Sequence, residues 1–142
     1  MFYGQVEVQL DEKNRIRIPS RYQKELGSNP FITCGPDKCL MIIPKEHANE
    51  LLSNMLSGSN FATVEKTRPM RVLLANGFFA EEDKQGRITL PQSLLKYSGI
   101  TKSIYFNGSN DRLEVWDKDT WDNYLASTDL NDCISYLSGK EE

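Results

Sequence analysis

The sequence of 142 residues lacks most of the features that mark membrane proteins, secreted proteins and enzymes. No apolar run is as long as a membrane span, and the first residues lack the basic stretch and long apolar segment of a secretory signal. These absences predict a cytoplasmic protein. The single histidine, His47, has no serine elbow or glycine-rich phosphate loop to accompany it. An enzyme is therefore disfavoured, and no cofactor or small-molecule substrate is expected.

Cysteine is also scarce, and its spacing does not indicate a metal site. The chain has three cysteines, which cannot all pair within one molecule. Cys34 and Cys39 are close in sequence, but no second cysteine pair exists and a zinc ion needs about four ligands. Reduced, structural thiols are the interpretation that fits a reducing compartment.

The net charge of −3 gives no basic excess of the kind that nucleic-acid binding requires. The acidic residues are concentrated near the end, however. Residues 117–142 hold seven of the 20 acidic residues and two of the 17 basic ones, which leaves 15 basic and 13 acidic residues elsewhere. The remainder is therefore slightly basic, and the average charge excludes neither class of partner.

An internal repeat organises the chain. DEKNRIRIPSRYQKEL (11–26) matches DKQGRITLPQSLLKYS (83–98) at an offset of 72 residues, with identical residues at the aspartate, arginine and proline positions. The match continues, after one inserted residue, from CLMIIPKEHANELL (39–52) to RLEVWDKDTWDNYL (112–125). Two copies are too few for a solenoid, so we expect them to pair into a pseudo-twofold unit.

Each copy shows the same succession of strands and helices. Alternating apolar residues predict strands over 5–10, 15–18, 31–34 and 40–43, and over 78–82, 87–90, 103–107 and 113–116. Helices are expected over 20–26, 45–55 and 118–127, and proline precedes the first of them. The apolar stripe of Trp121, Tyr124 and Leu125 in the last of these is interpreted as core.

The predicted organisation has four parts. A first half-domain spans 1–56, a connecting loop and helix 57–76, a second half-domain 77–127 and an acidic tail 128–142. The connecting helix either begins at Pro69 or begins near Phe61 and is kinked at the proline. Its Arg68 and Arg71 share a face and could meet phosphate or acids such as Glu81 and Glu82. The tail is expected to be polar and loosely held.

The chemistry concentrates in a D-x-x-[NG]-R turn that occurs twice. Asp11 and Asp83 can accept hydrogen bonds from their own turns, while Asn14 and Gly86 stand where a left-handed backbone is needed. The arginines that follow, Arg15 and Arg87, could simply form local ion pairs with these aspartates. Further basic residues favour a DNA contact instead, because a basic two-stranded ribbon can enter a major groove. These are Lys13, Arg17, Arg21 and Lys24 around the first turn and Lys84 in the second.

The opening MFYGQVEVQLDEKNRIRIPSRY, together with DKQGRITLP and RLEVWDKDTW, resembles the two signatures of the MraZ family. The resemblance implies an α+β, mainly β fold: two tandem swapped-hairpin (SpoVT/AbrB-like) half-domains forming a pseudo-twofold, barrel-like unit with flanking helices. It also implies a homo-oligomeric ring, an octamer or larger. Such a ring would bind double-stranded DNA at short direct promoter repeats of the division and cell-wall gene cluster, as a nucleoid-associated repressor.

Carried onto this sequence, the resemblance assigns DNA reading to Lys13 and Arg15, with Arg87 as the counterpart in the second copy. Arg17, Arg21 and Lys84 complete the expected contact set, and the first copy is expected to lead. The family usually has glycine where Asn14 stands, which affects base preference more than the fold. The alternative is an antitoxin-like or structural ring that does not read sequence; the short tail disfavours it.

Overall fold

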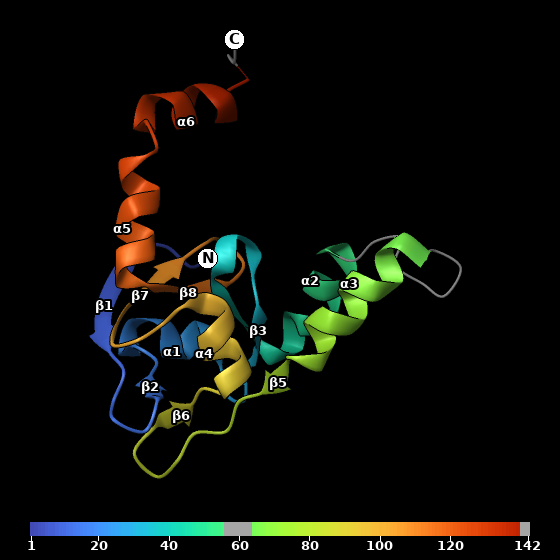
Figure 1. Ribbon diagram of the computed structural model, residues 1–142, viewed down its shortest axis with the longest axis vertical. Helices are drawn as coiled ribbons and strands as arrows, with labels where there is room; N and C mark the ends of the chain where they lie inside the picture. Colours follow the sequence, from blue (N-terminus) through green and yellow to red (C-terminus); the bar gives the residue numbers. More distant parts are fainter. Residues whose placement is uncertain (56–63, 140–142) are drawn as a thin grey trace.

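The computed structural model describes residues 1–55 and 64–139, in which both copies of the repeat have the same order of elements. The first copy comprises β1 (Gln5–Gln9), β2 (Arg15–Arg17), α1 (Ser20–Leu26), β3 (Phe31–Cys34), β4 (Leu40–Ile43), α2 (Lys45–Met55) and α3 (Val64–Ala75), with a short 3-10 helix, η1 (Pro36–Lys38), before β4. The second comprises β5 (Phe78–Phe79), β6 (Arg87–Thr89), α4 (Gln92–Ser98), β7 (Ser103–Gly108), β8 (Leu113–Asp117), α5 (Lys118–Ala126) and α6 (Leu130–Leu137) (Figure 1).

The two copies exchange strands. The main sheet has the order β1-β7-β8-β4-β3-β5, so the first strand of each copy pairs with the third strand of the other. The two hairpins meet at the centre, where β4 runs antiparallel to β8 with Leu40 opposite Val115. β2 and β6 form a separate two-stranded ribbon, again with one strand from each copy. The expected α+β fold of two tandem swapped halves is confirmed.

The main hydrophobic core lies between one face of the six-stranded sheet and the β2–β6 ribbon with its helices. Apolar side chains alternate along the short ribbon strands, and Ile16 and Ile88 lie opposite each other with 1% of each exposed. They pack in the same cluster as Phe106 and Leu113 of the sheet. A smaller cluster on the other face packs Ala48 of α2 against the sheet. Since both copies contribute to the main core, neither would bury enough surface alone.

Proline and glycine set the limits of the helices that follow the ribbon. Pro19 and Pro91 occupy the position before α1 and α4 in extended conformations, and their missing N–H ends the ladder there. Gly27 and Gly99 follow the helices with φ of 74° and 69°, which glycine adopts without a steric cost. The predicted helix start after Pro19 is therefore confirmed.

The connecting helix includes Pro69 in its interior, so it does not begin at that residue. The other expectation, a start near Phe61, and the predicted loop at 57–60 lie outside the described residues. No ion pair of the described ranges joins Arg68 or Arg71 to Glu81 or Glu82.

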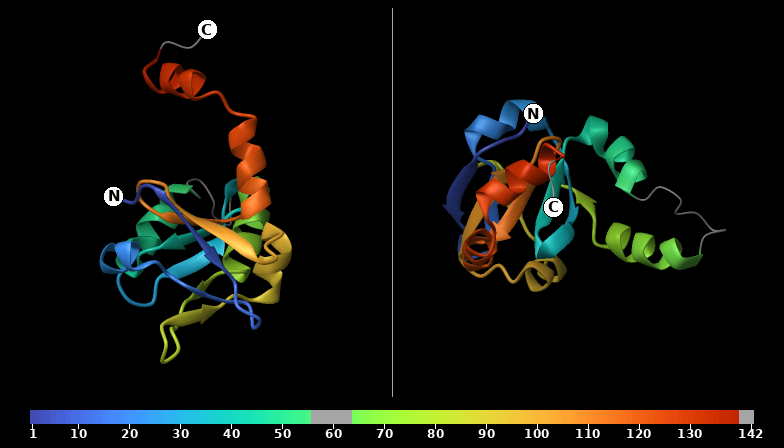
Figure 2. Two further views of the ribbon diagram at one scale, coloured as in Figure 1. Left: turned by 90° about the vertical axis from the view of Figure 1, so that its left-hand side faces the viewer. Right: turned by 90° about the horizontal axis from the view of Figure 1, so that it is seen from above.

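Two expectations about the end of the chain are wrong. The α5 stripe is not core, because Tyr124 and Leu125 remain 43% and 46% exposed although Trp121 and Tyr124 pack on Trp116. The tail is not simply polar, because it contains α6, a helix that exposes Leu130, Ile134 and Leu137 and stands at the far end of α5 away from the sheet (Figures 1 and 2). Of the helices described, none is long and apolar enough to cross a membrane.

Candidate nucleic-acid interface

The two D-x-x-[NG]-R turns have the same hydrogen bonds. The Asp11 carboxylate accepts the backbone N–H groups of Lys13 and Arg15, both at 2.9 Å. The Asp83 carboxylate accepts the corresponding N–H groups of Gln85 and Arg87, also at 2.9 Å. These hydrogen bonds satisfy backbone N–H groups of the turn itself, as the sequence predicted. They also fix the backbone position from which each arginine side chain extends.

The fourth residue of each turn has the left-handed backbone that the sequence indicated. Asn14 has a φ of 59° and Gly86 a φ of 76°. Asparagine tolerates this region and glycine enters it freely, whereas other residues are strained there. The substitution of one for the other between the copies therefore leaves the turn geometry unchanged.

Each aspartate also holds the arginine of its own turn. Arg15 donates from Nε to Asp11 Oδ2 at 2.6 Å, and Arg87 donates from Nε to Asp83 Oδ2 at 2.9 Å. One terminal nitrogen of Arg15, Nη1, also lies 3.9 Å from Asp83 Oδ2. The two turns are thus in electrostatic contact. Because the aspartates bond to Nε, Nη2 of Arg15 and the terminal nitrogens of Arg87 are not held by these carboxylates, and the two side chains are 23% and 28% exposed. A planar acceptor pair such as a guanine edge is the partner that suits such nitrogens.

The electrostatics keep both carboxylates ionised. Desolvation is the largest influence on the pKa of Asp11 and raises it. The hydrogen bonds from the backbone and side chain of Arg15 and from the backbone of Lys13 outweigh it and lower the pKa below its ordinary value. The pKa of Asp83 is lowered chiefly by the backbone N–H of Arg87. At neutral pH each arginine is therefore held by a charged partner.

The antiparallel pairing of β2 with β6 places one turn at each end of the ribbon, and both turns lie on the same side of the molecule, below the sheet in Figure 1. Arg15 lies opposite Thr89, and Arg17 lies opposite Arg87. Since Ile16 and Ile88 between them point into the core, the arginines lie on the outer face of the ribbon. The sequence placed these arginines on polar strand faces but could not show that they share one surface.

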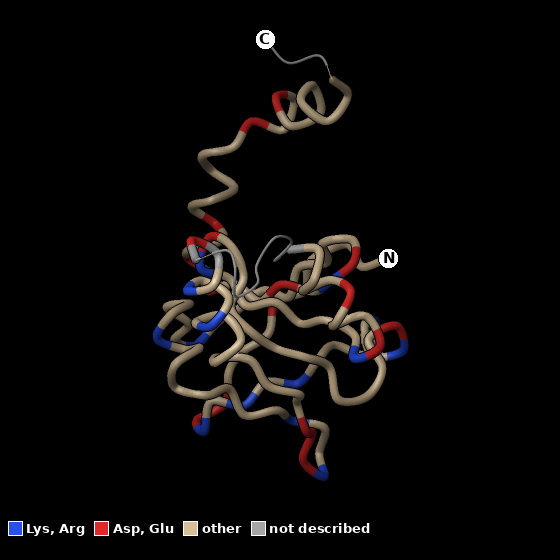
Figure 3. Tube along the Cα trace, turned by 90° about the vertical axis from the view of Figure 1, so that its right-hand side faces the viewer, with Lys and Arg blue, Asp and Glu red and all other residues tan. Residues whose placement is uncertain are grey.

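Lysines occupy the exposed tips of the turns, with acids beside them (Figure 3). Lys13 and Lys84 are both exposed, as is Arg17 on β2. Acidic residues next to the turns are exposed as well, namely Glu12 in the first turn and Glu81 and Glu82 before the second. The second turn is therefore flanked by more negative charge than the first.

Arg21 is not brought to the turns. Its guanidinium lies over the rings of Tyr3 and Tyr22, at 5.7 and 5.3 Å from their centroids. Tyr3 precedes β1 and the first turn follows it, so about 13 Å of strand separates the two places. The sequence grouped Arg21 with the first turn by proximity along the chain, but α1 directs it elsewhere.

Two comparisons relate this sequence to known proteins. A family model described as "MraZ protein, putative antitoxin-like" matches residues 1–71 and again 73–133. The chain is 35% identical over 131 residues to a "Transcriptional regulator MraZ" of Acetivibrio thermocellus, covering 92% of this chain and 91% of the relative. Proteins of the same name from Clavibacter michiganensis subsp. michiganensis and Parafrankia sp. are each 33% identical, over 129 and 127 residues and with at least 87% of either chain covered.

Proposed function

The chain belongs to the MraZ family, and from this membership and the paired turns we propose that it is a transcriptional regulator that binds DNA sequence-specifically. The observation that carries the proposal is the β2–β6 ribbon, which has one D-x-x-[NG]-R turn at each end and presents both turns on the same side of the molecule (Figure 1). Two-stranded ribbons fit the major groove of B-DNA. Relatives named as transcriptional regulators support the same assignment.

The turns divide the work of recognition. Arg15 and Arg87, held through Nε, direct their terminal amino groups toward base edges, where a bidentate arginine prefers the O6 and N7 atoms of guanine. Lys13, Lys84 and Arg17 are exposed beside them and contact phosphates, which gives affinity without sequence information. Arg21 lies outside this surface.

The targets we propose are short direct repeats in the promoter of the division and cell-wall gene cluster, which the protein represses. Each chain offers only a handful of basic residues, and acids accompany them, so one copy binds a single repeat weakly. A ring of eight or more copies engages several repeats together, and the effective concentration then supplies the missing affinity. The affinity for tandem repeats therefore falls steeply as the salt concentration rises, because each phosphate contact releases counterions.

The test is a gel shift on DNA that carries the tandem repeats upstream of the protein's own gene, compared with DNA that carries a single repeat. Arg15→Ala is expected to weaken binding about 5- to 150-fold per reading site, the effect of losing one bidentate base contact. Lys96→Ala removes one positive charge from the last turn of α4, outside the ribbon, and serves as the matched control.

Three results would decide against parts of this proposal. Equal binding by wild type and Arg15→Ala removes Arg15 from the reading surface. If Arg15→Ala and Lys96→Ala lose DNA affinity equally, the loss is explained by the change in net charge and not by a base contact of Arg15. Failure of the wild-type protein to bind at low salt favours the alternative, an antitoxin-like or structural ring that makes protein contacts and does not read DNA.

A further inference from the structure

Helix α6 has an apolar face that the described residues of its own chain leave largely uncovered. Leu130, Cys133, Ile134 and Leu137 follow the spacing i, i+3, i+4, i+7 and therefore lie on one side of the helix. Three of them are largely exposed, at 77% for Leu130, 59% for Ile134 and 82% for Leu137. Such a spacing is the pattern with which an amphipathic helix occupies a hydrophobic groove.

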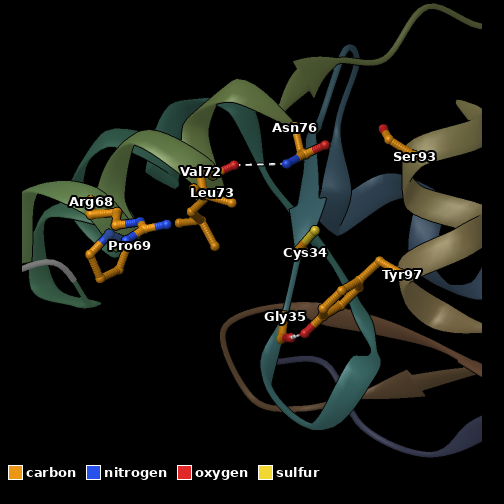
Figure 4. A pocket seen from close by; sticks show the side chains of 9 residues that line it. All are labelled: Cys34, Gly35, Arg68, Pro69, Val72, Leu73, Asn76, Ser93 and Tyr97. Atoms are coloured by element: carbon orange, nitrogen blue, oxygen red, sulfur yellow. Dashed lines mark hydrogen bonds between the residues drawn. The ribbon is translucent and has the colours of Figure 1, made fainter.

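The same chain has an apolar groove of about 520 Å³ between α3 and α4. One wall is the face of α3 that carries Pro69, Val72 and Leu73, and the opposite side is formed by Cys34 of β3 and Tyr97 of α4 (Figure 4). An apolar cavity of roughly 150 Å³ holds a benzene-sized group, so the groove has room for two or three aliphatic side chains. Val72 at its edge is 59% exposed.

The walls of this groove are held by specific contacts, so the hollow is built into the fold. Thr33 of β3, fully buried, donates its hydroxyl to the carbonyl of Leu73 at 2.8 Å and fixes α3 beside the sheet. The Tyr97 hydroxyl donates to the carbonyl of Gly35 at 2.5 Å and fixes the opposite side. A preformed groove binds a helix without paying to open itself.

Helix α6 lies far from the groove of its own molecule. α5 extends from the end of β8 and carries α6 away from the sheet, whereas the groove lies beside β3 on the body (Figures 1 and 2). An α6 helix that fills this groove therefore comes from a second copy.

Charge favours this occupant. Residues 119–138, which include most of α5 and all of α6, contain four acids and no lysine or arginine: Asp119, Asp122, Asp129 and Asp132. The α3 wall of the groove carries Arg68, and Arg71 is exposed one turn further on. The acidic helix and the basic wall attract each other, and this attraction orients the approach.

We propose that α6 of one copy docks in the α3–α4 groove of the next copy. The contact is head-to-tail, because each chain presents its helix on one side and its groove on another, and such contacts form a ring when the rotation between neighbours closes. This interface rests on the ring of the proposed function and names the surfaces that build it. A symmetric pairing of two α6 helices would instead stop at a dimer.

The first test is the mass of single variants, measured by light scattering after size exclusion. Val72→Asp charges the groove and Leu137→Asp charges the helix face, and both residues are exposed enough for the fold to tolerate the change. Each variant is expected to be monomeric where the wild type is a ring. The matched controls are Leu74→Asp, on α3 but outside the groove, and Ser135→Asp, on the polar side of α6; both should keep the wild-type mass.

Mixing the two disabled variants gives the sharper result. The Val72→Asp chain still has its α6 and the Leu137→Asp chain still has its groove, so a mixture forms one intact interface. The expected product is a dimer of one of each, which cannot grow further. A mixture that stays monomeric overturns the proposal, as does a Val72→Asp protein that keeps the wild-type mass.

Native cysteines provide a second measurement. Cys133 lies on α6 and Cys34 lines the groove, while Cys39 is fully buried. A short bismaleimide is expected to yield a ladder of linked chains that Cys34→Ser and Cys133→Ser each abolish and Cys39→Ser preserves. Linked dimers that survive in Cys34→Ser indicate α6–α6 pairing and contradict the proposed docking.

The outcomes for assembly and for DNA binding are separable. Arg15→Ala should keep the wild-type mass and lose DNA, whereas Leu137→Asp should lose the ring but retain weak binding to a single repeat. A wild-type protein that is monomeric yet binds tandem repeats refutes the interface and leaves the regulator intact. A protein that forms the ring through the groove but does not bind DNA supports the interface and refutes the proposed regulator function.

Discussion

Gly86 offers a direct test of the backbone argument for the turns, because the first copy contains the natural control. A Cβ added at Gly86 would meet only the Glu82 carboxylate end, at 3.6 Å, so space is available and the φ of 76° is the obstacle. Holding alanine in the left-handed region costs about 1–2 kcal/mol. The reduced freedom of the unfolded chain offsets about 0.4–1 kcal/mol of this. Gly86→Ala should therefore destabilise the protein by about 1 kcal/mol.

The expected change can be measured by thermal unfolding at fixed protein concentration. An unfolding entropy of about 2.1 cal/mol/K per residue gives about 0.3 kcal/mol/K for 142 residues, so the loss corresponds to a fall in Tm of about 3 °C. Gly86→Asn, which recreates the residue of the first turn, should lie within about 1 °C of the wild type. The reasoning is refuted if the alanine variant equals the wild type, or if asparagine is as damaging as alanine.

Three further predictions concern the ribbon, its carboxylates and its thiols. Ile16→Ala and Ile88→Ala should each lower the free energy of unfolding by about 2–4 kcal/mol in urea titrations, because both side chains are 1% exposed in the shared core; a loss below about 1 kcal/mol would contradict the packing. The pKa values of Asp11 and Asp83 are lowered in the folded protein, so their contribution to stability is present above about pH 4 and is lost as the pH falls through the folded pKa values. In a variant with asparagine at both positions, the free energy of unfolding should depend less steeply on pH in this acid range. Cys39, fully buried and with its thiol pKa raised by burial, should resist alkylation in the native protein and react on unfolding; equal labelling of all three thiols would count against its burial.

Secondary structure was predictable where the same sequence pattern occurs in both copies of the repeat. The strands 31–34 and 40–43 and the helices 20–26 and 45–55 have the expected limits, because alternation, proline and glycine act within a few residues of each other. β5 is shorter than expected, at two residues, since only Phe78 and Phe79 find partners on β3.

The surface of the site depended on pairing that local patterns do not encode. Both turns and their left-handed residues follow from D-x-x-[NG]-R, but Arg15 and Asp83 are 68 positions apart and meet only because β2 pairs with β6. Arg21 shows the converse, since four positions from Arg17 along the chain lead to a different face once α1 begins. Sequence proximity therefore indicated which basic residues lie together on the ribbon, but not that Arg21 lies apart from them on α1.

The charge of the tail predicts a polar segment, whereas its periodicity predicts a helix with an apolar face. Leu130, Ile134 and Leu137 have helical spacing, yet the surrounding acids suggested a solvated end. The α5 stripe was misjudged for the related reason that aromatic residues at helical spacing usually face a core of the same chain. Here Tyr124 and Leu125 are half-exposed, so the periodicity predicted the helix but not the surface against which its apolar face packs.

The end of the chain is also where the pseudo-twofold symmetry fails, and that failure supports the head-to-tail interface. In the order of elements α3 and α6 are equivalent, but α3 lies beside β3 and is followed by β5, whereas α6 stands away from the sheet. The described part of each chain therefore has one α3–α4 groove and one free amphipathic helix. One of each is the stoichiometry that a closed ring of identical subunits requires. Had both copies kept the α3 arrangement, the chain would present two grooves and no helix to fill them.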